Sequence, residues 1–366
     1  MLYWLLVPLR QYWFFFNVFR WITVRTALAG ITALFLSLLF GPMLIKLLKK
    51  YEIGQEIRLE GPQSHYSKKG TPSMGGILII GATIVPTLLW GNLENSYVWL
   101  GLGTMFFFGL VGFLDDYLKI KKKRSLGLIV RKKLVYQFFL AAVFALIVLY
   151  LGFSKGPESG FDLRLYLPFF KKFIPYLGWF YGLWIIFIMV SSSNAVNLAD
   201  GLDGLAIGLT LISAAALTAL TYIAGHAGFS DFLKIASVKQ AAELTVFAGA
   251  LTGACLGFLW FNSHPAQVFM GDVGALTLGG LIATLAVLLK QEFLFVISGG
   301  IFVLEAASVL IQEKIGINRL GRRLFYRAPL HHSFQYMGMA ESKVTVRFWI
   351  VSIILMILAL GSIKIR

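Results

Sequence analysis

Residues 178–225 read GWFYGLWIIFIMVSSSNAVNLADGLDGLAIGLTLISAAALTALTYIAG, and this stretch decides the fold class. A helix needs about 20 predominantly apolar residues to cross the hydrocarbon core of a bilayer, and the runs at both ends reach that length. The segment between them, NAVNLADGLDGLA at 194–206, carries two asparagines and two aspartates. The stretch therefore predicts two membrane-spanning helices joined by a polar turn.

The same alternation of apolar runs and polar turns extends along the whole chain. Residues are 58% hydrophobic and 14% charged, whereas soluble domains average about 25% charged residues. We therefore expect an all-α fold, a polytopic integral membrane helix bundle of about ten transmembrane helices, with 1–366 forming a single membrane domain. The apolar runs lie roughly at 22–46, 74–92, 98–114, 134–152, 178–196, 205–225, 243–260, 274–290, 293–313 and 345–363.

The segment before the first span has a different composition. Residues 1–21 are rich in Trp and Tyr, which suits a helix that lies at the membrane interface. The segment lacks the basic start and the small-residue cleavage site of a signal peptide. We expect an interfacial N-terminal helix, although the sequence leaves open whether it lies flat or spans.

Basic residues set the orientation of the bundle. Lys and Arg are concentrated in the loops 47–73, 115–133 and 314–344, and basic loops face the cytoplasm. With ten spans, the loops 197–204 and 261–273 fall on the same side. Membrane topology thus accounts for the net charge of +16. The chain has no aromatic–basic RNA motif and no zinc-type spacing, so no nucleic acid is an expected partner.

The unusual polar motifs all fall in these five loops. They are HYSKKGTPSMGG, FLDDYLKIKKK, NAVNLADGLDG, FNSHPAQVFMGDVG and RAPLHHSFQ. The distribution of Lys and Arg assigns these loops to the cytoplasmic side without reference to the motifs. The occurrence of all five motifs on that side is therefore partly independent evidence that they belong together. It predicts one functional site at the inner membrane surface.

Three aspartates form a candidate magnesium site. Asp115 and Asp116 end a span, where adjacent helical residues point about 100° apart, and Asp272 lies just before the span at 274–290. Magnesium is held by one or two carboxylates together with substrate phosphates and water, and these acids could supply such a site. The alternative is that the pair balances the following lysines and that Asp272 caps a helix.

Lysines near the acids are candidates for phosphate binding. Lys119, Lys123 and Lys133 could neutralise phosphate oxygens, or they could only anchor the loop to anionic lipid. Lys68 and Ser73 belong to the glycine-rich stretch KKGTPSMGG, where we take both as substrate-binding candidates. A lipid headgroup contact is the alternative for Lys68, and the chain has no Walker A pattern.

Four polar residues recur every third position in NAVNLADGLDG. If the segment stays helical, Asn194, Asn197, Asp200 and Asp203 form one polar ridge. The alternative is a loop with Asx turns that caps the next helix. A cap needs one such residue, so four in register favour a functional interpretation.

Polar residues also mark the C-terminal third of the chain. His331 and His332 follow a basic stretch, and their setting suits diphosphate binding or acid–base catalysis better than zinc binding. Glu305 and Gln312 are seven residues apart in one apolar run and so share a helix face. Glu305 is either functional or a partner for a neighbouring helix, and both interpretations stay open.

Taken together, the motifs resemble the phospho-N-acetylmuramoyl-pentapeptide transferase family. The likeness rests on GPQSHYSKKGTPSMGG, FGLVGFLDDYLK, NAVNLADGLDGLA, FNSHPAQVFMGDVGALTLGG and RAPLHHSFQ with VRFWI, and it covers nearly the whole chain in order. It implies a multi-pass enzyme of the bacterial inner (cytoplasmic) membrane with its active site facing the cytoplasm. Such an enzyme transfers phospho-MurNAc-pentapeptide from UDP-MurNAc-pentapeptide to undecaprenyl phosphate. The products are lipid I and UMP, and the implied cofactor is Mg²⁺.

The resemblance also implies roles for single residues. Asp115, Asp116 and Asp272 match catalytic acids, with Asp272 the favoured magnesium ligand and Asp115 the second. His331 and His332 match the first two positions of a triple histidine, whose third position here is Ser333. The positions that match a nucleotide pocket are Lys68, Asn197, Asp200, Asp203, Asn262, Phe269 and Gln312. Among them, Phe269 would stack on the uracil and Asp200 would accept its hydrogen bonds.

Two chemical routes fit these residues. Either an aspartate attacks the donor and forms a covalent phospho-sugar intermediate, or the lipid phosphate attacks directly. Direct attack is favoured because a phosphate monoester is already largely ionised at pH 7. The rival functions are a related transferase that uses UDP-GlcNAc and, from another class, a secondary transporter. The sequence does not fix the oligomeric state, and a homodimer is compatible with it.

Overall fold

The regular structure of the chain is helical. The computed structural model describes residues 1–51, 70–122, 127–156, 160–170 and 172–364. These residues form no β-strand, and an isolated antiparallel bridge joins Arg164 to Tyr176. The predicted all-α class is therefore confirmed. The helices are α1 (Leu2–Leu6), η1 (Pro8–Gln11), η2 (Phe14–Arg20), α2 (Ile22–Lys50), α3 (Gly76–Trp90), α4 (Ser96–Lys122), α5 (Val130–Lys155), α6 (Phe180–Ala199), α7 (Leu205–Gly225), α8 (Ala227–Leu233), α9 (Ala241–Asn262), α10 (Gly271–Leu288), α11 (Glu292–Ser298), α12 (Gly300–Leu310), η5 (Ile311–Ile317), α13 (Asn318–Leu320), α14 (Leu330–Tyr336) and α15 (Glu341–Ser362).

Ten segments of the described chain coincide with the ten predicted apolar runs. Eight of them, α2, α4, α5, α6, α7, α9, α10 and α15, are single helices long and apolar enough to cross a membrane. The other two are α3, which is apolar but has 15 residues, and a bent pair formed by α11 and Gly300–Leu320. The chain is therefore a multi-pass membrane protein.

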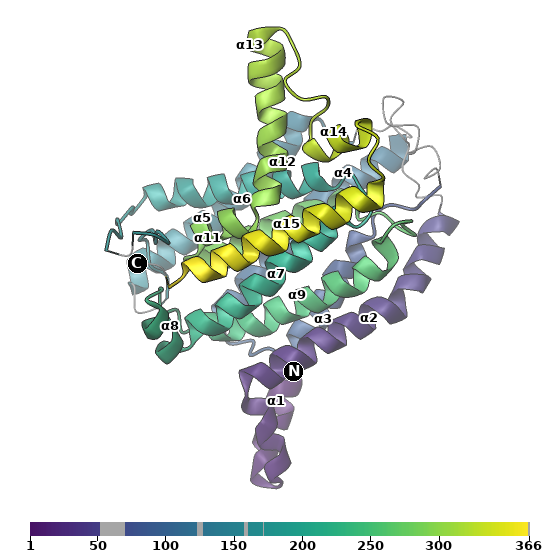
Figure 1. The fold of residues 1–366 in the computed structure, drawn as a ribbon. Coiled ribbons are helices and arrows are strands. Elements are labelled where there is room, and N and C mark those ends of the chain that lie inside the picture. The colour runs from purple at the N-terminus through teal and green to yellow at the C-terminus, as the bar shows by residue number, and fades with distance from the viewer. Residues whose placement is uncertain (52–69, 123–126, 157–159, 171, 365–366) are drawn as a thin grey trace.

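The ninth run departs from the prediction of one span at 293–313. The helix breaks at Gly299, and its two parts are bent by 79°. The break falls in the sequence Ser298-Gly299-Gly300, and pairs of Gly and Ser are a common cause of sharp kinks. The second part, Gly300–Leu320, contains α12, η5 and α13, and we call it the arm. It projects from one side of the bundle, opposite the N-terminal segment (Figure 1).

The N-terminal segment is not the single helix that the composition predicted. It forms the short helix α1 and the two 3₁₀-helices η1 and η2. Pro8 starts η1, and Trp13 has an extended backbone between η1 and η2, so helical hydrogen bonding cannot run through the segment. Tyr12 and Phe14 are among its most exposed aromatic side chains. An interfacial position for this segment stays a prediction.

The centre of the bundle is α10. In this helix 94% of the apolar window is buried, because α10 packs against α3, α4, α6 and α7. A helix that is apolar on every side belongs inside a bundle. The first turn of α10 contains Asp272, so the packing of the core fixes where this carboxylate lies.

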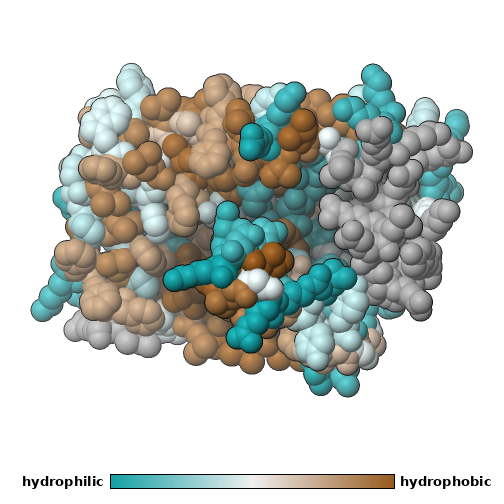
Figure 2. Space-filling model, turned by 90° about the horizontal axis from the view of Figure 1, so that it is seen from above, coloured by the Kyte–Doolittle hydropathy of each residue, from teal (hydrophilic) through white to brown (hydrophobic). Residues whose placement is uncertain are grey.

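The outer helices present apolar side chains to their surroundings. Phe35 and Leu39 on α2 and Ile357 on α15 are exposed. In the view toward the arm, hydrophobic residues cover much of the bundle, and hydrophilic residues gather at the arm's tip and toward the ends (Figure 2). Such a surface suits a lipid environment.

Gly76 permits close contact between α3 and α10. A Cβ atom at this position would lie 2.2 Å from the backbone nitrogen of Gly274, so backbone atoms would have to move. We expect Gly76→Ala to lower the free energy of unfolding by about 3 kcal/mol, measured by unfolding in detergent. Gly81→Ala on the same helix is the control, because its Cβ would meet no atom within 4 Å. Equal losses in the two variants would contradict this packing.

Candidate active site

Three buried carboxylates meet where α4 and α10 pack together. Asp115 and Asp116 lie near the end of α4, and Asp272 lies in the first turn of α10. Their side chains offer ligand atoms that all lie within 4.8 Å of one another. We call them the carboxylate cluster. The structure thus brings together the three acids that the sequence singled out from separate loops.

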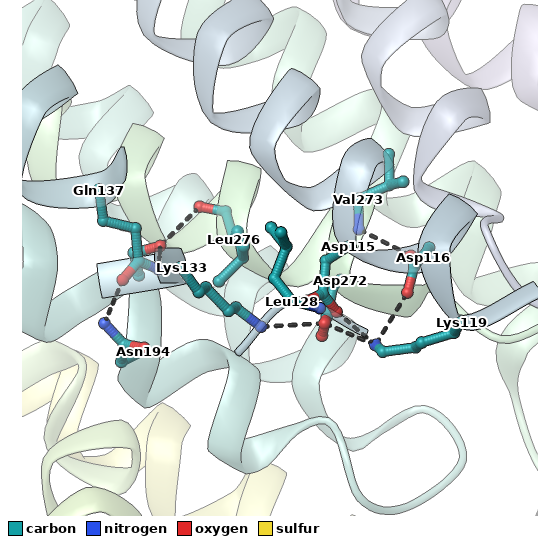
Figure 3. A network of polar contacts seen from close by, with 11 residues as sticks. Asp115, Asp116, Lys119, Leu128, Lys133, Gln137, Asn194, Asp272, Val273 and Leu276 are labelled. Carbon is teal, nitrogen blue, oxygen red and sulfur yellow. Dashed lines mark hydrogen bonds and ion pairs between the residues drawn. The ribbon is translucent and has the colours of Figure 1, made fainter. Parts of the chain in front are cut away.

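The Lys119 ammonium lies in contact with all three carboxylates. Its Nζ is 2.7 Å from Asp115 Oδ2, 3.0 Å from Asp116 Oδ1 and 2.6 Å from Asp272 Oδ2. Lys119 reaches Asp115 and Asp116 because it follows them by four and three residues on α4, the spacing of neighbours on a helix face. Asp272 comes to it from α10. The cluster therefore surrounds a point where positive charge is strongly favoured (Figure 3).

The other oxygen of each carboxylate is held by a protein N–H group. Asp115 Oδ1 accepts from the Leu128 backbone N–H at 2.8 Å, and Asp116 Oδ2 accepts from that of Val273 at 3.0 Å. With the Asn197 amide oriented so that both of its ends find partners, its nitrogen donates to Asp272 Oδ1 at 2.7 Å. Each carboxylate is thus fixed through one oxygen and presents the other to the cation.

A second lysine approaches the cluster from α5. Lys133 Nζ lies 2.9 Å from Asp272 Oδ2, and in the same amide orientation of Asn197 it donates to the amide oxygen at 3.0 Å. Behind it, Gln137 accepts from Asn194 Nδ2 at 2.9 Å and donates to Ser193 Oγ at 3.2 Å (Figure 3). This polar chain joins α5 to α6 beside the cluster.

The polar ridge predicted for NAVNLADGLDG forms only in its first half. Asn194 and Asn197 lie on α6, but the helix ends at Ala199. Asp203 therefore turns away from the cluster, and its Oδ2 lies 3.1 Å from both His264 Nδ1 and the Ala266 backbone nitrogen. Gly201 and Gly204 lie in the turn after α6. The helical spacing on which the predicted ridge depended does not continue through this turn.

Asp200 follows the last residue of α6 and is half-buried. Burial, and then the negative charges of Asp272 and Asp116, raise the pKa of Asp200 to about 8. Without a bound cation its carboxyl is therefore mostly protonated at neutral pH. A protonated carboxyl still accepts a hydrogen bond through its carbonyl oxygen, so the predicted acceptor role stays a prediction.

Backbone pairing brings the GTPSMGG segment to the start of α10. The Phe269 N–H donates to the Pro72 carbonyl at 2.8 Å, and the Gly75 N–H donates to the Phe269 carbonyl at 2.9 Å. Ser73 is buried in this segment, and a Cβ on Gly271 would meet both Ser73 Oγ and Asp116 Oδ2. Ser73 thus lies beside the carboxylate cluster. The side chain of Phe269 is half-buried.

Comparison with known proteins identifies the family. The model of glycosyl transferase family 4 matches residues 98–290, and a phospho-N-acetylmuramoyl-pentapeptide-transferase signature matches residues 68–80. Curated proteins named phospho-N-acetylmuramoyl-pentapeptide-transferase are similar over the whole of both chains: those of Koribacter versatilis and Desulfotalea psychrophila are 48% identical, and that of Desulfatibacillum aliphaticivorans is 49% identical. The chain belongs to the phospho-N-acetylmuramoyl-pentapeptide transferase family.

Some residues matched to this transferase family lie apart from the cluster. Asn262 accepts from the Gly204 N–H at 3.1 Å and donates to the Val268 carbonyl at 2.9 Å, so it ties two turns together. Gln312 accepts from the Leu324 and Phe325 N–H groups, each at 3.0 Å. Both amides organise loop backbone in this structure.

The two histidines that the transferase family pattern marks are in different environments. His331 has no exposed surface and contacts Glu305, whereas His332 is partly buried and lies 3.0 Å from Gln335 Oε1 on its own helix. Ser333, at the third position of the pattern, accepts from the Arg327 N–H at 3.0 Å and donates to its carbonyl. Ser333 therefore closes the turn before α14.

The structure leaves two predicted residues of the transferase site undescribed and adds others. Lys68 and Lys123 lie outside the described residues. The Leu128 N–H holds a carboxylate of the cluster, and Gln137 belongs to the polar chain that joins α5 to α6 beside it. Sequence analysis missed both residues. Gln137 carried a signal, because it is a polar residue inside an apolar run. The contribution of Leu128 is a backbone N–H, which no side-chain pattern reveals.

Proposed function

We propose that the chain transfers phospho-MurNAc-pentapeptide from UDP-MurNAc-pentapeptide to undecaprenyl phosphate and releases UMP and lipid I. The observation that carries the proposal is the buried cluster of Asp115, Asp116 and Asp272 around a lysine ammonium. It occurs in a chain that is 48% identical, over its full length, to proteins named for this transfer. A family name alone would not identify the reacting residues, and the cluster supplies them.

Mg²⁺ is the cofactor that suits this cluster. Carboxylate oxygens are hard ligands of the kind that Mg²⁺ prefers, and each acid here has at least one oxygen without a backbone hydrogen bond. The Lys119 ammonium occupies the position of a cation among those oxygens, which supports the fit. We assign Asp272 and Asp115 as ligands. The bound ion would stabilise negative charge on the donor diphosphate.

The reaction requires positioning and charge neutralisation more than covalent machinery. An oxygen of the lipid phosphate attacks the sugar-bearing phosphorus of the donor, and the bond from that phosphorus to the oxygen of UMP breaks. Lys133 and Lys119 place positive charge beside the diphosphate, and Asn197 holds Asp272 in orientation. Asp116 accepts a hydrogen bond from the Val273 backbone N–H at the start of α10. This contact holds its carboxylate beside the reacting phosphates.

The site opens to the cytoplasm in this proposal. The carboxylate cluster lies near the end of α4 that leads into the basic loop 115–133, and basic loops face inward. A soluble nucleotide donor and a lipid acceptor can both reach such a position at the inner leaflet of the bacterial cytoplasmic membrane. The nucleotide contacts proposed from the family pattern are Lys68, Asn197, Asp200, Asp203, Asn262, Phe269 and Gln312. Ser73 and Lys123 are further substrate-binding proposals, and of the two histidines His332 is proposed as a catalytic candidate.

The proposal predicts the donor. Purified protein with undecaprenyl phosphate and Mg²⁺ should release UMP from UDP-MurNAc-pentapeptide about 100-fold faster than from UDP-GlcNAc at equal concentration. Release of nucleotide, separated by chromatography, is the measurement. Faster turnover of UDP-GlcNAc would assign the chain to another donor. Substrate flux across proteoliposomes without UMP release would favour a transporter.

A further inference from the structure

Glu305 on the arm and His331 on α14 form a fully buried pair. Neither side chain has exposed surface. Glu305 Oε2 lies 3.1 Å from His331 Nδ1, and Oε1 accepts the His331 backbone N–H at 3.2 Å. The carboxylate therefore holds the residue at two points, one on the ring and one on the backbone.

The two contacts with Glu305 determine which ring nitrogen of His331 faces away from the carboxylate. Because Nδ1 donates its proton to the carboxylate, Nε2 is the remaining polar atom of the imidazole. Nε2 is buried and has no hydrogen-bond partner in the described part of the chain. A Cβ on Gly201 would lie 2.3 Å from it. The ring edge therefore packs directly against the turn that follows α6.

The same turn carries Asp200, the residue next to Gly201. Moving the imidazole would move the backbone of Gly201 and with it the half-buried carboxyl of Asp200. The described contacts place no part of the imidazole against the carboxylate cluster. The structure thus favours an action of His331 on the turn over direct contact with the reacting phosphates.

We propose that Glu305 and His331 are positioning residues that set the shape of the Asp200–Gly201 turn for the donor nucleotide. The inference rests on the proposed function, because it assigns the turn to donor binding. It links the base of the arm to the site through one carboxylate and one imidazole. A role in donor binding predicts a change in the KM for the donor and little change in kcat.

Glu305→Gln tests the pair with almost no change in volume. We expect the KM for UDP-MurNAc-pentapeptide to rise about 10- to 100-fold, a loss typical of removing a partner that orients an imidazole. We expect kcat and the KM for undecaprenyl phosphate to stay within about threefold. Glu313→Gln, the same exchange at an exposed position of the arm, should leave all three constants unchanged. A fall in kcat at an unchanged donor KM would overturn the proposal.

Gly201→Ala gives the matching change from the other side of the contact. Its methyl group would displace the ring, so it should raise the donor KM as Glu305→Gln does. The double variant should be little worse than either single one, because both act through His331. Additive effects would mean that the residues act independently.

A spectroscopic measurement separates this inference from the proposed function. The ¹⁵N resonances of His331, assigned by comparison with His331→Asn, should report a proton on Nδ1 in the wild-type protein and should change in Glu305→Gln. This readout needs no turnover. Unchanged resonances would refute the pair even in an active enzyme, whereas an inactive wild-type protein with the expected resonances would refute only the proposed function.

Discussion

Asp272→Asn should reduce magnesium-dependent UMP release about 1000-fold. The substitution keeps the size of the side chain but removes its charge from a site that Lys119, Lys133 and Asn197 all contact. The metal would then lose a fixed negative ligand at the start of α10, and with it part of its hold on the donor diphosphate. Release of UMP at saturating donor, acceptor and Mg²⁺ is the measurement.

Asp231→Asn is the matched control for this loss. Asp231 lies on the short helix α8, is exposed, and belongs to no part of the proposed site. Its activity should equal that of the wild-type protein. Near-normal turnover by Asp272→Asn would remove the carboxylate cluster from the mechanism, whatever the family of the chain.

Lys119→Met should make the protein dependent on Mg²⁺ for stability. In the absence of metal the variant leaves three buried carboxylates close together without the ammonium that now contacts them. Removing one partner from a buried ion pair costs about 3 kcal/mol, so we expect that loss of unfolding free energy in EDTA. Adding Mg²⁺ should restore most of the loss, because a ligand that binds only the folded state stabilises it by mass action.

Unfolding in detergent, with EDTA and with excess Mg²⁺, measures the effect. Lys122→Met serves as the control, since Lys122 ends the same helix and is exposed. It should show neither the loss nor the recovery. A destabilisation of Lys119→Met that Mg²⁺ does not reverse would show that the lysine is structural and that the cluster does not hold the metal.

The sequence predicted the features that depend on local composition. The apolar runs follow from the length that a bilayer demands, and the loop charges placed the five motifs on one side. Asp115, Asp116 and Asp272 were therefore predicted to lie together, and the structure places their carboxylates within 4.8 Å of one another. The polar spacing also led to Asn197, because that residue still lies on α6.

The features that the sequence missed depend on where helices end and bend. The ridge from Asn194 to Asp203 assumed a helix that continues, but α6 ends at Ala199. The ninth run has enough apolar residues for one span, and hydropathy does not report the 79° bend at Gly299. The contact of Lys119 with Asp272 and the pairing of Glu305 with His331 are tertiary, so neither has a signature in residue spacing.

The burial of α10 has a consequence for how variation in this protein should be interpreted. The same helix fills the middle of the bundle and carries the proposed metal ligand in its first turn. The packing of the interior and the affinity for the cation are therefore coupled. A conservative exchange deep in the hydrocarbon layer can therefore alter the Mg²⁺ titration curve while leaving every polar residue untouched.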